Sequence, residues 1–124
     1  MLISASVMAF VATKEPARAK AFYRDTLGLH LINDEQYAIV FESNGIMLRV
    51  QKAQEFSPAP YTVLGWKVKD IHSEIEALVQ LGVTFESYPG LFQDGSGVHT
   101  FPDGTMVAWF KDPDGNLLSL TQFS

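Results

Sequence analysis

The sequence predicts an α+β fold in which one β-α-β-β-β module occurs twice. Thirteen residues separate the helix-start signal at Glu15 from the closing glycine Gly28, and twelve separate Asp70 from Gly82. A β-rich segment precedes each of these stretches and shorter strand candidates follow it, which is the pattern of an internal repeat. Near the end of the chain, Asp-Pro-Asp-Gly at 112–115 lies between two apolar segments and predicts a hairpin turn.

The first module is predicted to span about residues 1–52. Residues 3–12 are rich in strand formers, and Pro16 lies where a helix begins. Ala19, Phe22, Tyr23, Thr26 and Leu27 then recur at the spacing of one helix face. Three strands are expected next, at 29–33, 37–43 and 46–51, the last two joined by the hairpin signal Asn44-Gly45.

Residues 53–60 contain two prolines and little pattern, so they are interpreted as a linker within a single domain of 124 residues. The second module, about 61–124, repeats the order of the first: a strand at 61–68, a helix from Asp70 and a strand at 83–88. A glycine-rich excursion at 89–104 is expected to add a hairpin arm with a Pro-Asp-Gly turn. The two strands around 112–115 complete the module.

Composition and charge restrict the classes of function. The chain has no cysteine and a net charge of −5, with six basic and five acidic side chains in residues 1–52 but three and eight in residues 61–124. Such a balance argues against nucleic-acid binding, which needs clustered Lys and Arg. No apolar run is long enough to cross a membrane. The lack of cysteine agrees with a cytoplasmic location.

Alternation along the strands assigns side chains to two faces. Helix-facing positions are apolar, whereas the opposite positions are mixed; the mixed set is Met8, Phe10, Ala12, Met47, Arg49, Gln51, Val63, Gly65, Lys67, Leu117, Ser119 and Thr121. Trp109 falls on the same side, since Ala108 and Phe110 face the helix. A mixed sheet that curls with its helices outside would enclose these residues in a cup, and a cup with a few polar groups is the usual form of a ligand site.

Two motifs, Ala21-Phe22-Tyr23-Arg24-Asp25-Thr26-Leu27-Gly28 and the Asp-Pro-Asp-Gly hairpin, resemble the vicinal oxygen chelate superfamily. This superfamily includes glyoxalase I, extradiol dioxygenases and bleomycin-binding proteins, and the resemblance covers the whole chain. It implies the glyoxalase/bleomycin resistance fold and a homodimer. In its metal-dependent members four side chains, usually His or Gln, Glu, His and Glu, hold a divalent cation. By resemblance, these four positions fall on Met8, Arg49, Val63 and Ser119.

The donor set at these positions predicts no metal and no cofactor. Divalent cations such as zinc and iron need imidazole, carboxylate or similar donors. A thioether, an isopropyl group and a hydroxyl are poor substitutes, and a guanidinium repels a dication. Arg49 is therefore interpreted either as a group that binds an anionic or carbonyl-bearing ligand, or as a rim arginine paired with Glu42.

Two further residues complete the set of candidate ligand-binding residues. Trp109 is either an aromatic wall that stacks a planar or cationic ligand or a space-filling core residue. His99, on the hairpin arm, is either a general base or ligand contact or a structural histidine.

Three functions remain open from the sequence. The first is a metal-independent small-molecule-binding protein that resembles the bleomycin-binding proteins. The second is an enzyme of lyase, isomerase or dioxygenase type that uses a non-standard site such as Arg49 with His99. The third is a dimeric scaffold with a vestigial pocket.

Overall fold

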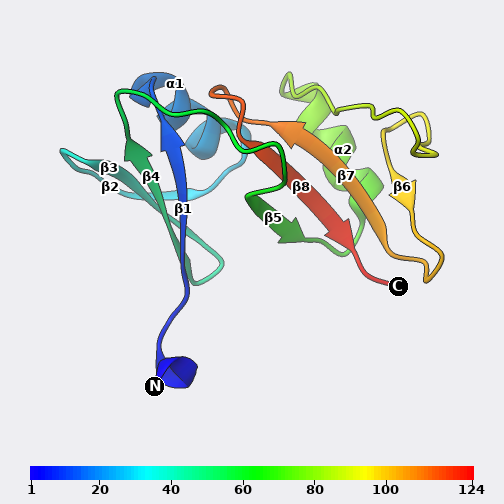
Figure 1. Cartoon of the computed structure of the whole chain (residues 1–124), viewed down its shortest axis with the longest axis horizontal. Coiled ribbons are helices and arrows are strands. Elements are labelled where there is room, and N and C mark those ends of the chain that lie inside the picture. Colours follow the sequence, from blue (N-terminus) through cyan, green and yellow to red (C-terminus); the bar gives the residue numbers. More distant parts are fainter. The chain divides into compact units, whose positions relative to one another are not determined.

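The structure is a computed structural model that describes all residues, 1–124. The chain divides into two compact units, Met1–Pro58 and Ala59–Ser124, and the division falls within the stretch predicted as a linker. Each unit contains one four-stranded mixed sheet with a helix on one face (Figure 1).

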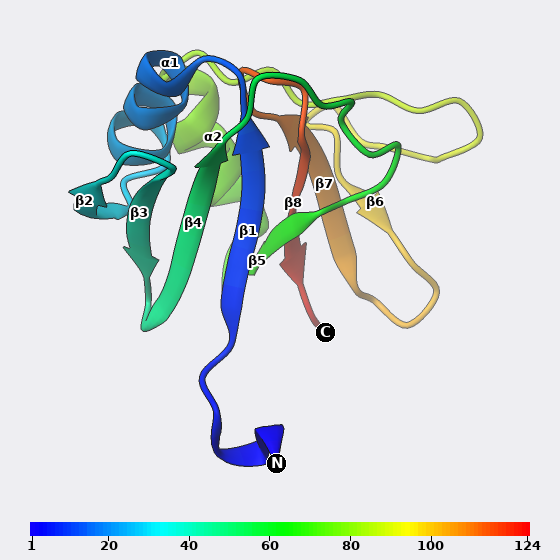
Figure 2. The same ribbon diagram turned by 60° about the vertical axis from the view of Figure 1, so that its left-hand side comes forward.

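The first unit contains strands β1 (Met8–Thr13), β2 (His30–Asp34), β3 (Ala38–Ser43) and β4 (Ile46–Lys52). They lie in the order β1-β4-β3-β2, as Figure 2 shows. β1 pairs with β4 in parallel, whereas β2, β3 and β4 form an antiparallel meander. The turn between β3 and β4 has positive φ at both Asn44 (47°) and Gly45 (87°). This is the conformation that Asn-Gly favours in two-residue hairpins, as the sequence predicted.

One helical segment covers the sheet of the first unit. It consists of α1 (Pro16–Ala21) followed directly by a π-helical turn at Phe22–Thr26. The fully buried Tyr23 packs its ring against Phe41 of β3, with a centroid distance of 5.9 Å. Gly28 ends the segment with φ of 74°, which a side chain with a Cβ adopts only at a cost.

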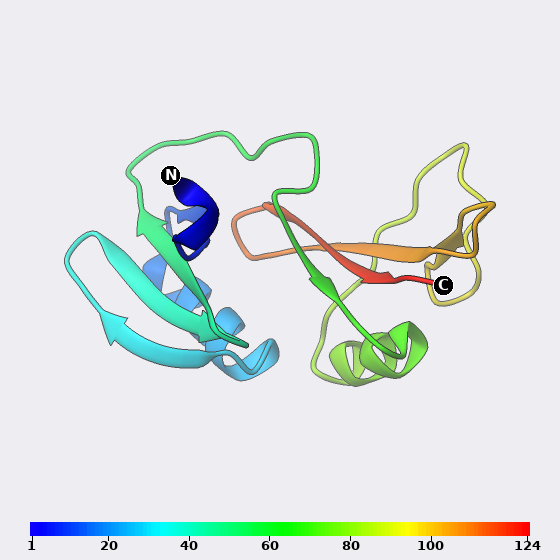
Figure 3. The ribbon, with the colours of Figure 1, turned by 90° about the horizontal axis from the view of Figure 1, so that it is seen from below.

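The second unit contains β5 (Leu64–Lys67), α2 (Ile71–Gln80), β6 (His99–Thr100), β7 (Met106–Lys111) and β8 (Leu117–Gln122). Its strands lie in the order β5-β8-β7-β6, with β5 and β8 parallel. Figure 3 shows α2 along one face of this sheet. Asp70 caps the helix by accepting a hydrogen bond from the Ser73 amide, which confirms the predicted helix start.

The turn between β7 and β8 is organised by the Asp112 carboxylate, which is 5% exposed. Its Oδ1 accepts hydrogen bonds from the amides of Asp114 and Asn116, both at 2.9 Å, and its Oδ2 accepts one from the Asn116 side chain at 2.8 Å. Gly115 takes φ of 87° and donates its amide to the Asp112 carbonyl. The predicted Asp-Pro-Asp-Gly turn therefore forms, and a buried acid holds it together.

The cores follow the predicted alternation. Helix-facing residues of the strands are buried in both units, among them Val11, Ile39, Phe41, Leu48, Val50, Ala108, Phe110, Leu118 and Leu120. In each unit the opposite face, called here the open face, carries the mixed set of side chains. The expected α+β fold with two β-α-β-β-β modules is confirmed.

Three predicted strands are shorter than expected, and the one predicted at 61–68 is confined to β5, Leu64–Lys67. Residues 3–7 do not join β1: Leu2–Ser4 forms a 3-10 turn, and the strand begins at Met8, opposite Met47 of β4. Because β4 itself begins at Ile46, the residues before Met8 have almost no strand to pair with. The predicted strand at 83–88 is reduced to a single bridge between Phe85 and Phe110.

Candidate functional site

The open face of the first sheet carries three of the seven candidate residues. Met8 and Phe10 of β1 are 45% and 49% exposed, which is high for large apolar side chains in a sheet. Arg49 of β4 lies beside Phe10 in the parallel register, and Met47 lies beside Met8. This face therefore combines an exposed apolar surface with one guanidinium group.

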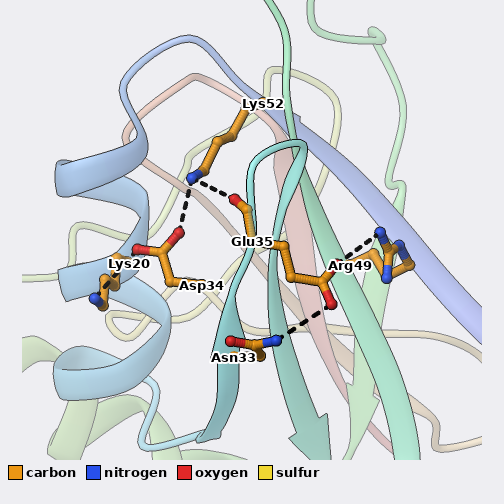
Figure 4. Close-up of polar contacts among 6 residues, drawn as sticks. All are labelled: Lys20, Asn33, Asp34, Glu35, Arg49 and Lys52. Carbon is orange, nitrogen blue, oxygen red and sulfur yellow. Dashed lines mark hydrogen bonds and ion pairs between the residues drawn. The ribbon is translucent and has the colours of Figure 1, made fainter.

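Arg49 is held by a partner that the sequence did not indicate. Its Nη2 lies 3.3 Å from Oε1 of Glu35, and the other oxygen of Glu35 accepts a hydrogen bond from Asn33 (Figure 4). The predicted partner Glu42 is wrong, because that carboxylate accepts the amide of Gly45 in its own turn at 2.7 Å. Arg49 has five N–H donors, and the contact with Glu35 uses one of them.

A second charged group lies at the end of the same sheet. Lys52 donates to Oδ1 of Asp34 at 2.7 Å and to the Glu35 carbonyl at 2.7 Å, and Lys20 donates to Oδ2 of Asp34 at 3.2 Å (Figure 4). The hydrogen bonds from Lys52 and then Lys20 lower the pKa of the Asp34 carboxyl below its ordinary value. These contacts fix the β2–β3 connection, and with it the backbone that carries Glu35 over the open face.

The open face of the second sheet carries Trp109, Ser119 and His99. Trp109 lies opposite Ser119, which in turn lies opposite Gly65 of β5. The Trp109 ring is half-buried. It lies perpendicular to the Tyr88 ring, with the two ring centroids 5.6 Å apart. A Cβ added to Gly65 would approach the Ser119 hydroxyl to 2.7 Å, so the glycine keeps this part of the face low. Val63 lies just before β5 on the same side, where its amide bonds to the Leu117 carbonyl.

His99 lies on β6, beside Val107 of β7, at the edge of this face. Its ring meets Phe101 edge-on at 4.6 Å. Its Nδ1 is buried and has no hydrogen-bond partner. An unsatisfied buried nitrogen costs free energy, which sets His99 apart from the exposed His30 and from His72, which has a partner.

A glyoxalase/bleomycin resistance protein/dioxygenase superfamily model matches residues 5–120, which is nearly the whole chain. The chain belongs to this superfamily. The suspected kinship with the vicinal oxygen chelate proteins is thereby confirmed. No protein of curated function matches the sequence.

Solved structures of this superfamily share the fold at low sequence identity. A lactoylglutathione lyase from Agrobacterium tumefaciens is 19% identical with a TM-score of 0.75, over 96% of this chain and 93% of that chain. A superfamily member from Sphaerobacter thermophilus DSM 20745 is 23% identical with a TM-score of 0.77, over 98% and 99%. A fosfomycin resistance protein from Listeria monocytogenes is 15% identical with a TM-score of 0.77, over 98% and 95%.

The residues at the four expected metal positions do not fit a divalent cation. Arg49 brings a positive charge, and one of its guanidinium nitrogens lies 3.3 Å from a Glu35 carboxylate oxygen. Nowhere in the chain do three or more His, Cys, Asp or Glu side chains gather in a way that would hold a metal ion. The side chains at these four positions are a thioether, a guanidinium, an isopropyl group and a hydroxyl, which are not the donors that divalent cations prefer.

A groove of about 660 Å³ lies elsewhere in the second unit, along α2 and the segment 83–97. His72 of α2 and Asp94 close one part of it, with Nε2 2.8 Å from Oδ2. Burial acts to raise the pKa of Asp94, but hydrogen bonds from His72 and from the amides of Val98 and Ser96 lower it on balance. None of the seven candidate residues lines this groove.

Sequence reasoning missed the residues that surround the candidates. Glu35 gives no local signal because it lies 14 residues from Arg49 and is brought to it by the β2–β3 connection. Tyr88 ends the predicted strand 83–88, but only the Phe85–Phe110 bridge forms there, so strand alternation does not place its ring. Alternation did place Gly65 and Lys67 on the open face, although neither was selected as a site residue.

Proposed function

We propose that the protein binds a small organic molecule on its open sheet faces without a metal ion. The observation that carries this proposal is the guanidinium of Arg49 at a position where, by resemblance, metal-dependent relatives supply an acid. The guanidinium lies in an exposed apolar surface with Met8, Met47 and Phe10, and its charge is only partly used by Glu35. Polar groups within an apolar surface are typical of ligand sites.

Trp109, Ser119, Val63 and His99 are proposed as the ligand-contacting residues of the second unit. The Tyr88 and Trp109 rings form a perpendicular pair, and such a contact favours one orientation of Trp109, which would lower the entropy cost of stacking a ligand on it. Relatives of the same fold include a protein named for fosfomycin resistance and one named as a lyase. Binding and catalysis are therefore both compatible with this architecture.

A homodimer in the cytoplasm is the proposed working form. Exposed apolar side chains gather at the start of the chain, where Leu2 and Ile3 are 81% and 97% exposed and Val7 is 69% exposed. Large exposed apolar side chains that gather in one part of a chain favour an interaction site there. No helix is long and apolar enough to cross a membrane. Light scattering coupled to gel filtration is expected to give twice the mass of 13.8 kDa.

A thermal-shift screen of small organic molecules tests the proposal. A ligand at one hundred times its Kd stabilises the native state by about 2.7 kcal/mol, which raises Tm by about 10 °C in a chain of this size. The shift is expected to be the same in EDTA and in added zinc, and to be lost in Trp109→Leu. Trp66→Leu is the matched control, because Trp66 lies in the same unit but on the helix-facing side. A ligand shift that disappears in EDTA and returns with a stoichiometric metal would refute metal-independent binding.

The alternative is an enzyme of lyase, isomerase or dioxygenase type, and one observation favours it. The unpartnered Nδ1 of His99 is the kind of strained group that active sites retain. Every ligand from the screen is therefore incubated with the protein and followed by mass spectrometry. Unchanged ligand after many protein equivalents supports binding, whereas turnover that His99→Gln abolishes supports the enzyme.

A further inference from the structure

The charges of the second unit are separated between its surfaces. The unit has three basic and eight acidic side chains, a formal charge of −5. Two of its three lysines, Lys67 of β5 and Lys111 of β7, lie on the open face, on the same side as Ser119 and Trp109. The third, Lys69, lies in the connection between β5 and α2. Most of the positive charge of an acidic unit is thus collected on one surface.

The acidic side chains of the unit lie almost entirely elsewhere. Asp70, Glu74 and Glu76 belong to the cap and body of α2, Asp94 pairs with His72 of that helix, and Asp103, Asp112 and Asp114 lie in hairpin turns. Only Glu86 lies with the open face, where its Oε1 is 3.7 Å from the Lys111 ammonium. The face therefore has a formal charge of +1. Lys67 has no carboxylate partner, and its ammonium lies over the Phe123 ring, 6.0 Å from the ring centroid.

Small residues separate Trp109 from Lys67 on the open face of the second sheet. Trp109, Ser119 and Gly65 lie side by side across three strands, and Lys67 is two residues beyond Gly65 on β5. Ordinary strand spacing puts the Cα atoms of Trp109 and Lys67 about 12 Å apart. Between them lie Ser119, with a small side chain, and Gly65, with none. A Cβ at position 65 would come within 2.7 Å of the Ser119 hydroxyl oxygen. A flat molecule can therefore lie over Ser119 and Gly65.

From this arrangement we propose that the open face of the second sheet selects planar aromatic anions. The aromatic rings lie against Trp109 and over Ser119 and Gly65, and the anionic group points to Lys67. The Lys67 ammonium rests over the Phe123 ring, 6.0 Å from the ring centroid, and its flexible stem lets it turn toward a ligand of about two fused rings with one carboxylate. This inference rests on the proposed function and adds the ligand's charge and shape, because an ammonium on the same rings would meet Lys67 instead of an acid.

Isothermal titration calorimetry with three probes of equal shape tests the inference. The probes are 2-naphthoate, the neutral 2-naphthamide and the cationic 2-naphthylmethylammonium, titrated into the full chain at 20 mM and 200 mM NaCl. Naphthoate is expected to bind at least tenfold more tightly than either other probe at low salt, and to lose most of this advantage at high salt.

Variants assign the effect to named side chains. Lys67→Gln is expected to weaken naphthoate binding about fivefold and to leave the amide within twofold, whereas the control Lys69→Gln leaves both unchanged. Glu86→Gln is expected to tighten naphthoate binding, because it removes the only acid of the face and frees Lys111. Trp109→Leu is expected to weaken all three probes by similar factors.

The possible failures are distinguishable. Preference for the amide or the ammonium, abolished by Trp109→Leu, would overturn the selection of anions and leave small-molecule binding intact. Equal losses in Lys67→Gln and Lys69→Gln would show a general charge effect and overturn the role of Lys67. Absence of binding by all three probes would overturn the inference, and the unbiased thermal-shift screen would then judge the proposed function separately.

Discussion

Removal of the Asp112 carboxylate is expected to destabilise the second unit more than an Asp→Ala substitution in any other turn of this unit. Asp112→Ala deletes the acceptor of three hydrogen bonds of 2.8 to 2.9 Å. Two of the three donors belong to Asn116, which is 5% exposed, so water replaces the lost acceptor poorly. Leaving buried donors unsatisfied costs about 1–3 kcal/mol each, and these losses are not additive, so the expected decrease is about 3 kcal/mol.

Urea unfolding followed by tryptophan fluorescence measures this decrease. Both tryptophans, Trp66 and Trp109, lie in the second unit, so the signal reports the unit that contains the turn. Asp103→Ala is the matched control, because Asp103 accepts hydrogen bonds from the amide and the side chain of Thr105 in an exposed turn, where water replaces a lost acceptor. Its expected cost is clearly smaller than that of Asp112→Ala, because its donors stay accessible to water. Equal midpoints for the two variants would refute the reasoning that burial makes the Asp112 hydrogen bonds more valuable.

Two further outcomes are expected in the first unit and in the turns. The Asp34 carboxyl, followed by NMR, is expected to titrate below its ordinary pKa, and Lys52→Met is expected to raise that pKa more than Lys20→Met, since the Lys52 hydrogen bond is the larger cause. Because the folded-state pKa of Asp34 is depressed, the stabilisation by its ion pairs is present above pH of about 4 and is lost as the pH falls through the folded-state value. An equal change of the Asp34 pKa in both variants would contradict the larger role of Lys52. Gly28→Ala is expected to cost about 1 kcal/mol through its φ of 74° alone, as nothing lies within 4 Å of the added Cβ. Gly95→Ala, equally uncrowded but without positive φ, is expected to cost little, and equal costs in urea unfolding would show that φ is not the cause.

Local patterns predicted most of the architecture because they report forces that act within a few residues. Alternation places Ser119 and Trp109 on the side away from α2, because a strand turns each successive side chain to the opposite face. Asn44-Gly45 and Gly28 adopt the positive φ values that their residue types tolerate. The segment before Met8 was predicted as strand from its apolar composition, but a strand also needs a neighbour, and β4 ends the available edge at Ile46.

The candidate site was less predictable because its contacts connect distant residues. Arg49 and Glu42 lie on the same face of neighbouring strands, so their pairing was a reasonable expectation. The amide of Gly45 binds Glu42 instead, and Glu35 reaches Arg49 because the irregular pairing near Leu31 and Asn33 shifts the register of β2. Such competition between partners depends on distances that spacing along the chain does not contain.

The two sheets share no strand, and this has a consequence for how copies of the chain can combine. Every strand pairing lies either within Met1–Pro58 or within Ala59–Ser124. Two chains can therefore exchange units by domain swapping without breaking any hydrogen bond between paired strands. For the same reason, a chain cut between Pro58 and Ala59 can be reassembled from its two fragments. The peptide that connects the two units sets the effective concentration of one unit near the other. Its length and stiffness therefore decide whether a unit associates with the other unit of its own chain or with that of a second chain.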